Sequence, residues 1–385
     1  MLDGDPYLVV NDEGRLIWMQ DAYTASSDFP YSTPMRITER PSATTGEAAE
    51  GQFDRTHNIN YIRNAVKVTV DAYHGSVAYY LSDPADPIIQ SYARAFPGVF
   101  LPFDELPEDL TSHVRYPEDL FNIQAHQYIT YHMTDVRVFY NKEDLWQIPT
   151  EISNTGEGQI EPYYVTLPLP GSTEPEYLLI LPFSPATKNN MIGWMAARND
   201  PEHYGHLIVY ELPKQELIFG PIQVEGRIDQ EPVISQQFSL WDQRGSSVIR
   251  GNLLVLPINQ SFLYIEPVYL LSETSALPEL KRIVTASNTA VAMADTLNNS
   301  LIALAQGSVA VATDQTPTVT PPEDAPAPPR PAVPETLDDL VAAANGHLQA
   351  AETAQRQGDW AAYGRELESL RAILAQLAEL TGQAQ

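Results

Sequence analysis

Hydrophobic and polar residues alternate along two stretches of the first eighty residues. Residues 7–10 form a short apolar run, 11–14 (Asn-Asp-Glu-Gly) are typical of a turn, and 15–23 alternate again. Residues 65–73 also alternate, turn at His74-Gly75 and return over 76–81. Because a period of two places alternate side chains on opposite faces of a strand, both stretches predict β-hairpins. The polar stretch 32–58 has no period and predicts a surface loop.

Helix signals follow. Asp86 is a good N-cap, Pro87 suits the first helical position, and this helix should end before Pro97-Gly98. Pro107 and Pro117 each precede acidic residues, which favour the positive end of a helix. We expect the second of these helices to reach about residue 131, with a short turn within 141–146.

The second half of the body predicts further strands at 163–167, 177–182, 207–212 and 217–219, with a helix at 191–197. The polar stretch 150–162 is a candidate subdomain border. Residues 222–241 predict two helices broken near Pro232, and 248–258 pairs with 262–271 as an apolar hairpin. A strand near Ile283 and a helix at 296–305 complete an α+β body, with mixed, mainly antiparallel sheets and helical insertions, over residues 1–307.

The composition changes sharply after residue 307. Residues 308–334 are rich in proline and predict a semi-rigid tether, which would reach about 80 Å at roughly 3.1 Å per residue. Residues 335–382 predict a two-helix hairpin that turns at Gly358-Asp359 and resembles helix-pair modules of the tetratricopeptide kind. Its apolar stripe consists of Leu367, Leu370, Ile373, Leu374, Leu377 and Leu380. We expect this hairpin to bind a protein partner or to self-associate.

Charge and composition narrow the classes of partner. Lys and Arg total 22 against 50 Asp and Glu, which gives a formal net charge of -28. Such a surface repels phosphate backbones, so nucleic acid is not expected as a partner. The chain has no Cys, which excludes disulfides, thiolate nucleophiles and zinc–thiolate sites. It also lacks an apolar run of about 18 residues, so we expect it to be soluble.

Three polar groups are candidate binding sites. Two combine amide or cationic side chains with an aromatic residue and could recognise a carbohydrate or carboxylate, or simply fix loops. They are Asn60, Arg63 and Lys67 beside Tyr61, and Asn189, Asn190 and Trp194. The third group is Arg227, Asp229, Gln236 and Arg244. Its oxygens suit a hard cation such as calcium, although the arginines would compete for the carboxylates and favour ion pairs. No cofactor is otherwise expected, and no catalytic motif is present, so the sequence gives no positive indication of an enzyme.

Three segments resemble Uncharacterised Protein Family 0182: "NYIRNAVKVTVDAYHG" (60–75), "KNNMIGWMAAR" (188–198) and "RIDQEPVISQQFSLWDQRGSSVIRGNLLVLPI" (227–258). The resemblance covers residues 5–307. It implies a bacterial multi-spanning membrane protein of the plasma membrane, with this portion on the extracytoplasmic side. The chain would then be an excised soluble part, and the alternative is a soluble protein that never had the spans.

Three functions are compatible with that setting. The first is a binding or assembly module, in which the tethered hairpin finds a partner. The second is an envelope enzyme of hydrolase type, in which a pair such as Asp229 and Glu231 does acid–base work. The third is a substrate-gathering domain of a transporter. The absence of catalytic motifs favours the first.

Overall fold

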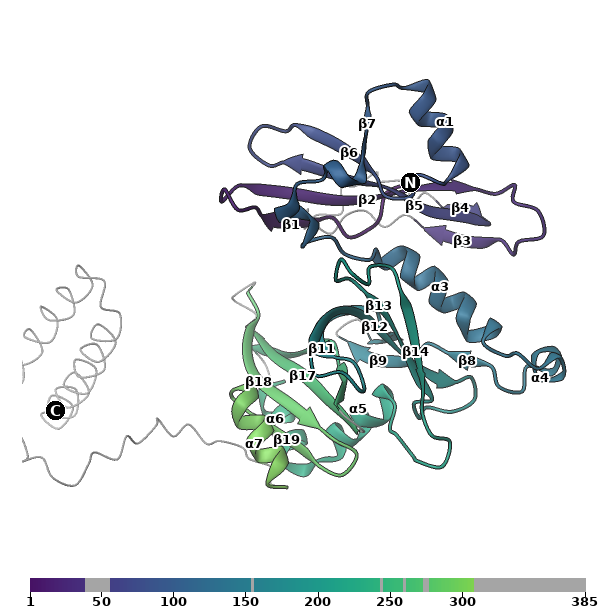
Figure 1. The fold of residues 1–385 in the computed structure, drawn as a ribbon. Helices are drawn as coiled ribbons and strands as arrows, with labels where there is room; N and C mark the ends of the chain where they lie inside the picture. Colours follow the sequence, from purple (N-terminus) through teal and green to yellow (C-terminus); the bar gives the residue numbers. More distant parts are fainter. Residues whose placement is uncertain (39–55, 154–155, 243–244, 259–260, 273–276, 308–385) are drawn as a thin grey trace, which may run out of the picture. The chain divides into compact units, whose positions relative to one another are not determined.

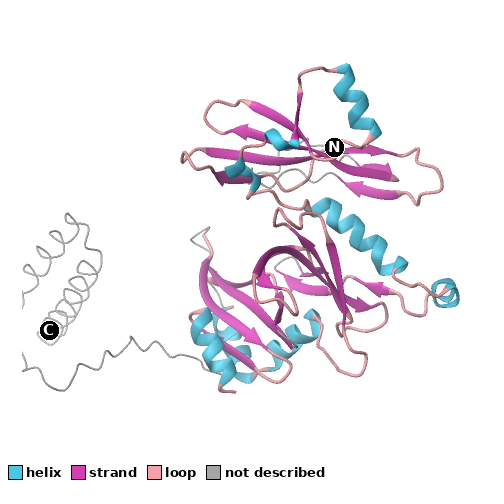
Figure 2. Ribbon diagram, viewed as in Figure 1, coloured by secondary structure: helices cyan, strands magenta, loops and turns pink. Residues whose placement is uncertain are grey.

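The computed structural model describes residues 1–38, 56–153, 156–242, 245–258, 261–272 and 277–307. The chain divides into two compact units, residues 1–314 and 315–385. The described residues all belong to the first unit, and they confirm the α+β prediction (Figure 2). The predicted tether (308–334) and helical hairpin (335–382) lie outside the described residues and stay predictions.

The N-terminal sheet confirms both predicted hairpins (Figure 1). Its strands, in spatial order, are β1 (Tyr7–Val10), β2 (Leu16–Ser26), β5 (Tyr61–Asp71), β6 (Val77–Leu81) and β7 (Phe100–Pro102). All neighbours are antiparallel except β6 and β7, which are parallel. The long β2–β5 ladder shifts register between Ala22 and Tyr23.

The loop predicted at 32–58 was wrong at its two ends. Residues there form β3 (Met35–Thr38) and β4 (Thr56–Ile59), which pair as a small antiparallel sheet. Short strands of mixed polarity carry little alternation, so their pairing partner decides their structure. Residues 39–55 lie outside the described residues.

Helices and short turns follow the sheet where the capping signals predicted them. They are α1 (Pro87–Ala95), η1 (Phe103–Glu105), α2 (Glu108–Thr111), α3 (Glu118–Tyr131) and α4 (Val136–Asn141). The Asp86 side chain accepts a hydrogen bond from the Ile89 amide at 2.7 Å, which fixes the start of α1. The short turn expected within 141–146 is present at residues 142–144, and helix α4 precedes it because Asp135 caps that helix by accepting from the amides of Arg137 and Val138.

The second sheet contains one clear correction. Its strands are β11 (Tyr163–Pro168), β12 (Pro175–Pro185), β13 (Gly193–Arg198) and β14 (Leu207–Glu211), with β8 (Trp146–Gln147) paired to β12. The helix predicted at 191–197 is strand β13, since this short apolar run is buried between β12 and β14. The polar stretch 150–162 holds a hairpin of β9 (Thr150–Ser153) and β10 (Gly156–Gln159). Residues 217–219 form no strand.

The third sheet follows two helices, α5 (Pro221–Gln230) and α6 (Pro232–Trp241), which break at Pro232 as predicted. The sheet consists of β15 (Ser246–Arg250), β16 (Leu254–Ile258), β17 (Ser261–Ser272), β18 (Glu279–Ala286) and β19 (Val291–Ala294). The strand predicted over 248–258 is split into β15 and β16, which both pair with β17. Helix α7 (Leu297–Ala305) confirms the helix predicted at 296–305, and Thr296 caps it by accepting a hydrogen bond from the Asn299 amide.

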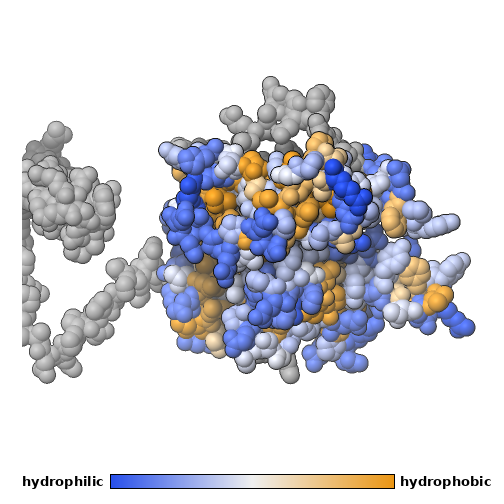
Figure 3. Space-filling view, turned by 45° about the horizontal axis from the view of Figure 1, so that its top comes forward, coloured by the Kyte–Doolittle hydropathy of each residue, from blue (hydrophilic) through white to orange (hydrophobic). Residues whose placement is uncertain are grey.

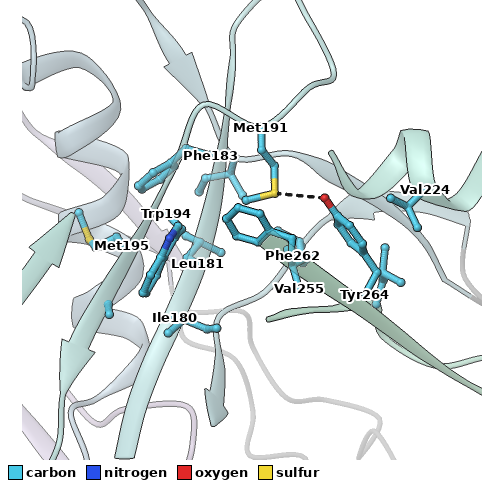
Figure 4. Packing of buried hydrophobic residues seen from close by; sticks show 14 of the residues in the cluster. Ile180, Leu181, Phe183, Met191, Trp194, Met195, Val224, Val255, Phe262 and Tyr264 are labelled. Atoms are coloured by element: carbon cyan, nitrogen blue, oxygen red, sulfur yellow. Dashed lines mark hydrogen bonds between the residues drawn. The ribbon is translucent and has the colours of Figure 1, made fainter. Parts of the chain in front are cut away.

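The largest hydrophobic core joins the second and third sheets (Figure 4). Phe183 and Trp194 come from β12 and β13, whereas Phe262 and Tyr264 come from β17. The Tyr264 hydroxyl donates to the carbonyl of Phe219 and lies 4.0 Å from the sulfur of Met191. Strands from both sheets therefore share one core.

Candidate functional site

The N-terminal sheet has an apolar face that is open to solvent. Cross-strand pairing places seven apolar side chains on this face. Leu8 lies opposite Trp18, and Val10 lies opposite Leu16. Trp18 lies opposite Val70, Val70 lies opposite Val77, and Tyr79 lies on the same face opposite Val68. Five of them are 37–56% exposed, namely Leu8, Val10, Leu16, Val77 and Tyr79. We call Leu8, Val10, Leu16, Trp18, Val70, Val77 and Tyr79 the open face.

The opposite face of the same strands is buried. Tyr7, Ile17, Met19 and Tyr80 pack with Leu106 and other residues of the following turns and helices. An antiparallel sheet with one solvated face normally carries polar side chains there, because alternation separates a core side from a water side. Here both faces are apolar. Exposed apolar patches of this kind are typical of protein interaction surfaces.

Helix α1 covers only one end of this face. Ile89 packs against Val66 and Val68, while Tyr92 on the same helix and Phe96 at its C-cap stay exposed and stack with their ring centroids 6.5 Å apart. Figure 3 turns this part of the molecule toward the viewer and shows hydrophobic residues gathered across it. The exposed Tyr73, in the β5–β6 turn, lines a shallow hollow of about 460 Å³ at the edge of the face, beside Leu16.

Lys67, a predicted binding residue, lies on the buried side of the sheet. It forms an ion pair with Asp21 and donates to the carbonyl of Arg115 at 2.8 Å. Only 1% of Lys67 is exposed, so it cannot reach a ligand in solution. Burial raises the pKa of the Asp21 carboxyl, which Lys67 and Asn64 partly offset by stabilising its charge. The pair holds the first sheet against the segment that follows α2.

Arg115 is the centre of that contact, and sequence reasoning missed it. Its guanidinium lies 3.6 Å from the ring centroid of Tyr7 and 4.7 Å from that of Tyr164, and pairs with Asp5 at 3.4 Å. Burial, followed by repulsion from Asp5 and Asp3, raises the pKa of the nearby Glu118 to about 7. Stacked arginine between two tyrosines is a stabilising cation–π arrangement.

The other residues of the first predicted group fix a loop. The Asn60 side chain donates to the carbonyl of Phe29 at 2.8 Å and accepts from its amide at 3.0 Å. Arg63 lies 5.7 Å from the Tyr61 ring centroid. Neither is brought to Lys67 as a common pocket, because Lys67 points to the buried face.

The second predicted group is divided between a turn and a strand. Asn189 and Asn190 lie between β12 and β13, where Asn190 donates to the carbonyl of Met191 at 3.2 Å. Trp194 is buried within β13 and stacks on Tyr210, with the two ring centroids 4.6 Å apart. The aromatic residue is therefore part of the core, and the amides shape the turn.

The third predicted group contains one member of a buried ionic cluster. Asp229 of α5 accepts a hydrogen bond from Arg250 at 2.9 Å. Arg250 also makes a two-bond pair with Glu266 of β17 and an ion pair with Glu225 of α5. The side chains of Glu225 and Glu266 are both fully buried. Three carboxylates thus converge on a single guanidinium.

This charge imbalance perturbs the titration of the cluster. Burial, followed by repulsion from Glu266, raises the pKa of Glu225 to about 8, so this carboxyl is mainly protonated at neutral pH. Burial also raises the pKa of Glu266, although its bonds to Arg250 oppose the shift. Burial raises the pKa of Glu151 of β9 as well. Its carboxylate accepts a hydrogen bond from the Leu253 amide at 2.8 Å, which opposes the shift.

Arg227 and Gln236, the other described members of the third group, lie apart from this cluster. Arg227 donates to the carbonyl of Ser287 at 2.7 Å and lies 4.9 Å from the Phe219 ring centroid. Gln236 is exposed on α6, and Arg244 lies outside the described residues. Asp229 is therefore paired with Arg250, which the sequence analysis did not single out. Glu231, the other residue of the expected acid–base pair, lies between α5 and α6.

Arg250, Glu225 and Glu266 were missed although the sequence contains a signal for one of them. Glu266 is a lone charge inside the apolar strand 261–272, and a buried charge needs a partner. Within the described part of the chain, no three His, Asp or Glu side chains gather as metal ligands.

The comparisons with known proteins decide the family. The model of the uncharacterised protein family UPF0182 matches residues 1–241. This chain belongs to UPF0182. A UPF0182 protein of Desulforamulus reducens is 51% identical over 376 residues, covering 97% of this chain and 38% of the relative. A UPF0182 protein of Pelotomaculum thermopropionicum is 48% identical over 382 residues, covering 99% of this chain and 38% of the relative. No solved structure matches the chain.

The chain thus spans less than two fifths of the length of these UPF0182 relatives. Among the helices that the structure describes, none is long and apolar enough to cross a bilayer. The open face, Glu225 and Asp229 lie within the residues matched by the UPF0182 model, whereas Arg250 and Glu266 lie beyond them.

Proposed function

We propose that this chain is a binding or assembly module on the extracytoplasmic side of the bacterial plasma membrane, within a larger membrane protein. The open face of the N-terminal sheet is the observation that carries the proposal. A contiguous apolar surface of this size on a folded body marks an interaction site. The formal net charge of -28 disfavours nucleic acid and anionic lipid as partners, so we propose a protein partner.

The membrane location rests on the family resemblance and on length. Since the chain covers 38% of its UPF0182 relatives, most of their length lies in other segments, and membrane spans would belong there. The predicted hairpin at 335–382 is proposed as a second association element. Its stripe of leucines would pack against a partner helix or a second hairpin.

Labelling in cells tests the location. The chain has no Cys, so Tyr73→Cys places one thiol at a position that is 87% exposed. The variant is made in the full-length protein, and intact cells are treated with a membrane-impermeant maleimide. We expect labelling of Tyr73→Cys above the unsubstituted protein. Labelling only after the cells are broken open would place this portion in the cytoplasm and refute the proposed location.

A second candidate function, substrate gathering for a transporter, is favoured by one surface groove. The β11–β12 and β13–β14 turns enclose about 920 Å³, lined by Tyr210 and Ile208 and by the Arg198–Glu176 pair. Polar side chains, among them Asp200, Glu202 and His203, also line this groove, and such groups can fix the orientation of a bound ligand. A thermal-shift series with free amino acids and simple sugars tests it. A ligand that raises Tm in the native chain but not in Tyr210→Ala supports this function, and no shift with any of them counts against it.

A further inference from the structure

We propose that the open face packs against the same face of a second copy of this chain, so that two N-terminal sheets form a symmetric sandwich. This inference rests on the proposed function, because it names the partner of the association module. The residues that carry it are Leu8, Leu16, Trp18, Val77 and Tyr79, with Val10 and Val70 between them.

The shape of the face suits a second copy. Four antiparallel strands, β1, β2, β5 and β6, present their side chains in register on one surface. Two such sheets pack face to face about 10 Å apart with interdigitating side chains. A twofold axis needs only one self-complementary patch on each copy, because both copies use the same residues.

The charge of the face also favours a second copy. None of its seven side chains is charged, and Arg15, next to Leu16, is already paired with Asp71. A second copy would bring no unpaired charge into the buried interface. A basic partner would find no carboxylate on the face, and an anionic lipid surface would be repelled by the chain as a whole. The net charge of -28 makes two copies repel at long range, so screening by salt should strengthen the dimer.

The available area approaches that of a stable interface. A large side chain presents about 150–250 Å² when exposed, so the partly exposed open face offers on the order of 400 Å². The ring centroids of Phe100 and Tyr79 are 6.1 Å apart, and the half-exposed ring of Tyr92 on α1 adds to the apolar surface beside Phe100. With Tyr73 and Phe96 the surface reaches roughly the 800 Å² per partner of a standard interface.

Sedimentation equilibrium on the full chain tests the proposal. We compare the native chain with Val77→Glu, which puts a charge on the open face at the start of β6, and with Val136→Glu, which makes the same change at an 80% exposed position on α4. We expect a native dimer, at least a tenfold weaker dimer for Val77→Glu, and no change for Val136→Glu. The native dimer should tighten between low and high salt.

A folding control and a hairpin variant distinguish association through the open face from association through residues 335–382. Circular dichroism and urea unfolding establish that Val77→Glu is folded, and Val77→Thr serves as a milder variant if it is not. A third variant, Leu370→Glu with Leu374→Glu, alters the predicted hairpin. Dimers that persist in Val77→Glu and vanish in the hairpin variant would overturn the inference and assign association to residues 335–382. A monomeric native chain would also overturn it, while the proposed binding function would still be decided by the labelling of Tyr73→Cys.

Discussion

Replacing Glu225 by glutamine should stabilise the folded chain at neutral pH. Glu225→Gln keeps the shape of the side chain and its carbonyl oxygen, which can still accept from Arg250. Arg250 also keeps its two hydrogen bonds to Glu266. The substitution therefore removes mainly the third carboxyl of a cluster that contains one cation.

The size of the effect follows from the pKa difference between the folded and unfolded states. Both states hold a protonated Glu225 below its ordinary pKa of 4.5. As pH rises from 4.5 to about 8, the unfolded chain releases this proton while burial and Glu266 keep it on the folded chain. Stability therefore falls by about 1.36 kcal/mol per pH unit over this window. If Glu225 titrates alone, the loss by pH 7 is on the order of 3 kcal/mol.

Urea unfolding of the native chain and Glu225→Gln at pH 4.5, 6, 7 and 8 measures this difference. We expect the variant to gain stability relative to the native chain as pH rises, by about 3 kcal/mol between pH 4.5 and 7. Glu202→Gln, at an exposed position in a turn, is the matched control and should show no such trend.

A difference that is constant across pH would refute the reasoning, because Glu225 would then have the same pKa in both states. A variant that loses stability as pH rises would show the opposite. Glu225 would then be ionised and stabilised by Arg250, and the cluster would be a balanced ion pair.

Further predictions concern the packing of single residues. Arg250→Met leaves the fully buried Glu266 without its cation, and should cost about 3–5 kcal/mol in urea unfolding at pH 7, where exposed Arg137→Met should cost little. Lys67→Met leaves the buried Asp21 without its cationic partner and should destabilise the folded chain by a similar amount. An unchanged midpoint of urea unfolding would show that Asp21 is solvated or neutral. Gly220→Ala forces a methyl group against the carbonyl of Asn189 and should cost about 1–3 kcal/mol in thermal unfolding, whereas Gly226→Ala on α5 meets no atom and should not. Removing residues 315–385 should leave the unfolding of the first unit unchanged, and a large loss of stability would contradict their assignment as a separate unit.

Local signals in the sequence were enough to predict much of the fold. Alternation located the hairpins of the N-terminal sheet, and the Asp86-Pro87 and Pro232 signals fixed the ends of α1, α5 and α6. These features depend on residues close together in the chain. By contrast, the apolar run at 191–197 has no period that separates a helix from a strand, and the pairing with β12 and β14 decided it.

The ionic cluster and the open face depend on distant residues. Glu225 and Arg250 come from a helix and a strand, and Asp229 gave no indication of which arginine it would meet. The valines at 66, 68 and 70 predicted an apolar strand face, but not which part of it α1 would leave uncovered. The sequence therefore indicated which types of residue form the candidate site, but it did not show where in the fold they would come together.

A distance measurement between copies tests the association of the N-terminal sheets most directly. The Cys-free chain allows a single spin label at Val77→Cys, and pulsed electron paramagnetic resonance then reports label pairs only if copies associate. We predict one narrow intermolecular distance from Val77→Cys, lost when unlabelled native chain is added in excess, and a different, longer distance from Val136→Cys. No dipolar coupling at concentrations where the chain sediments as a dimer would contradict packing through the open face.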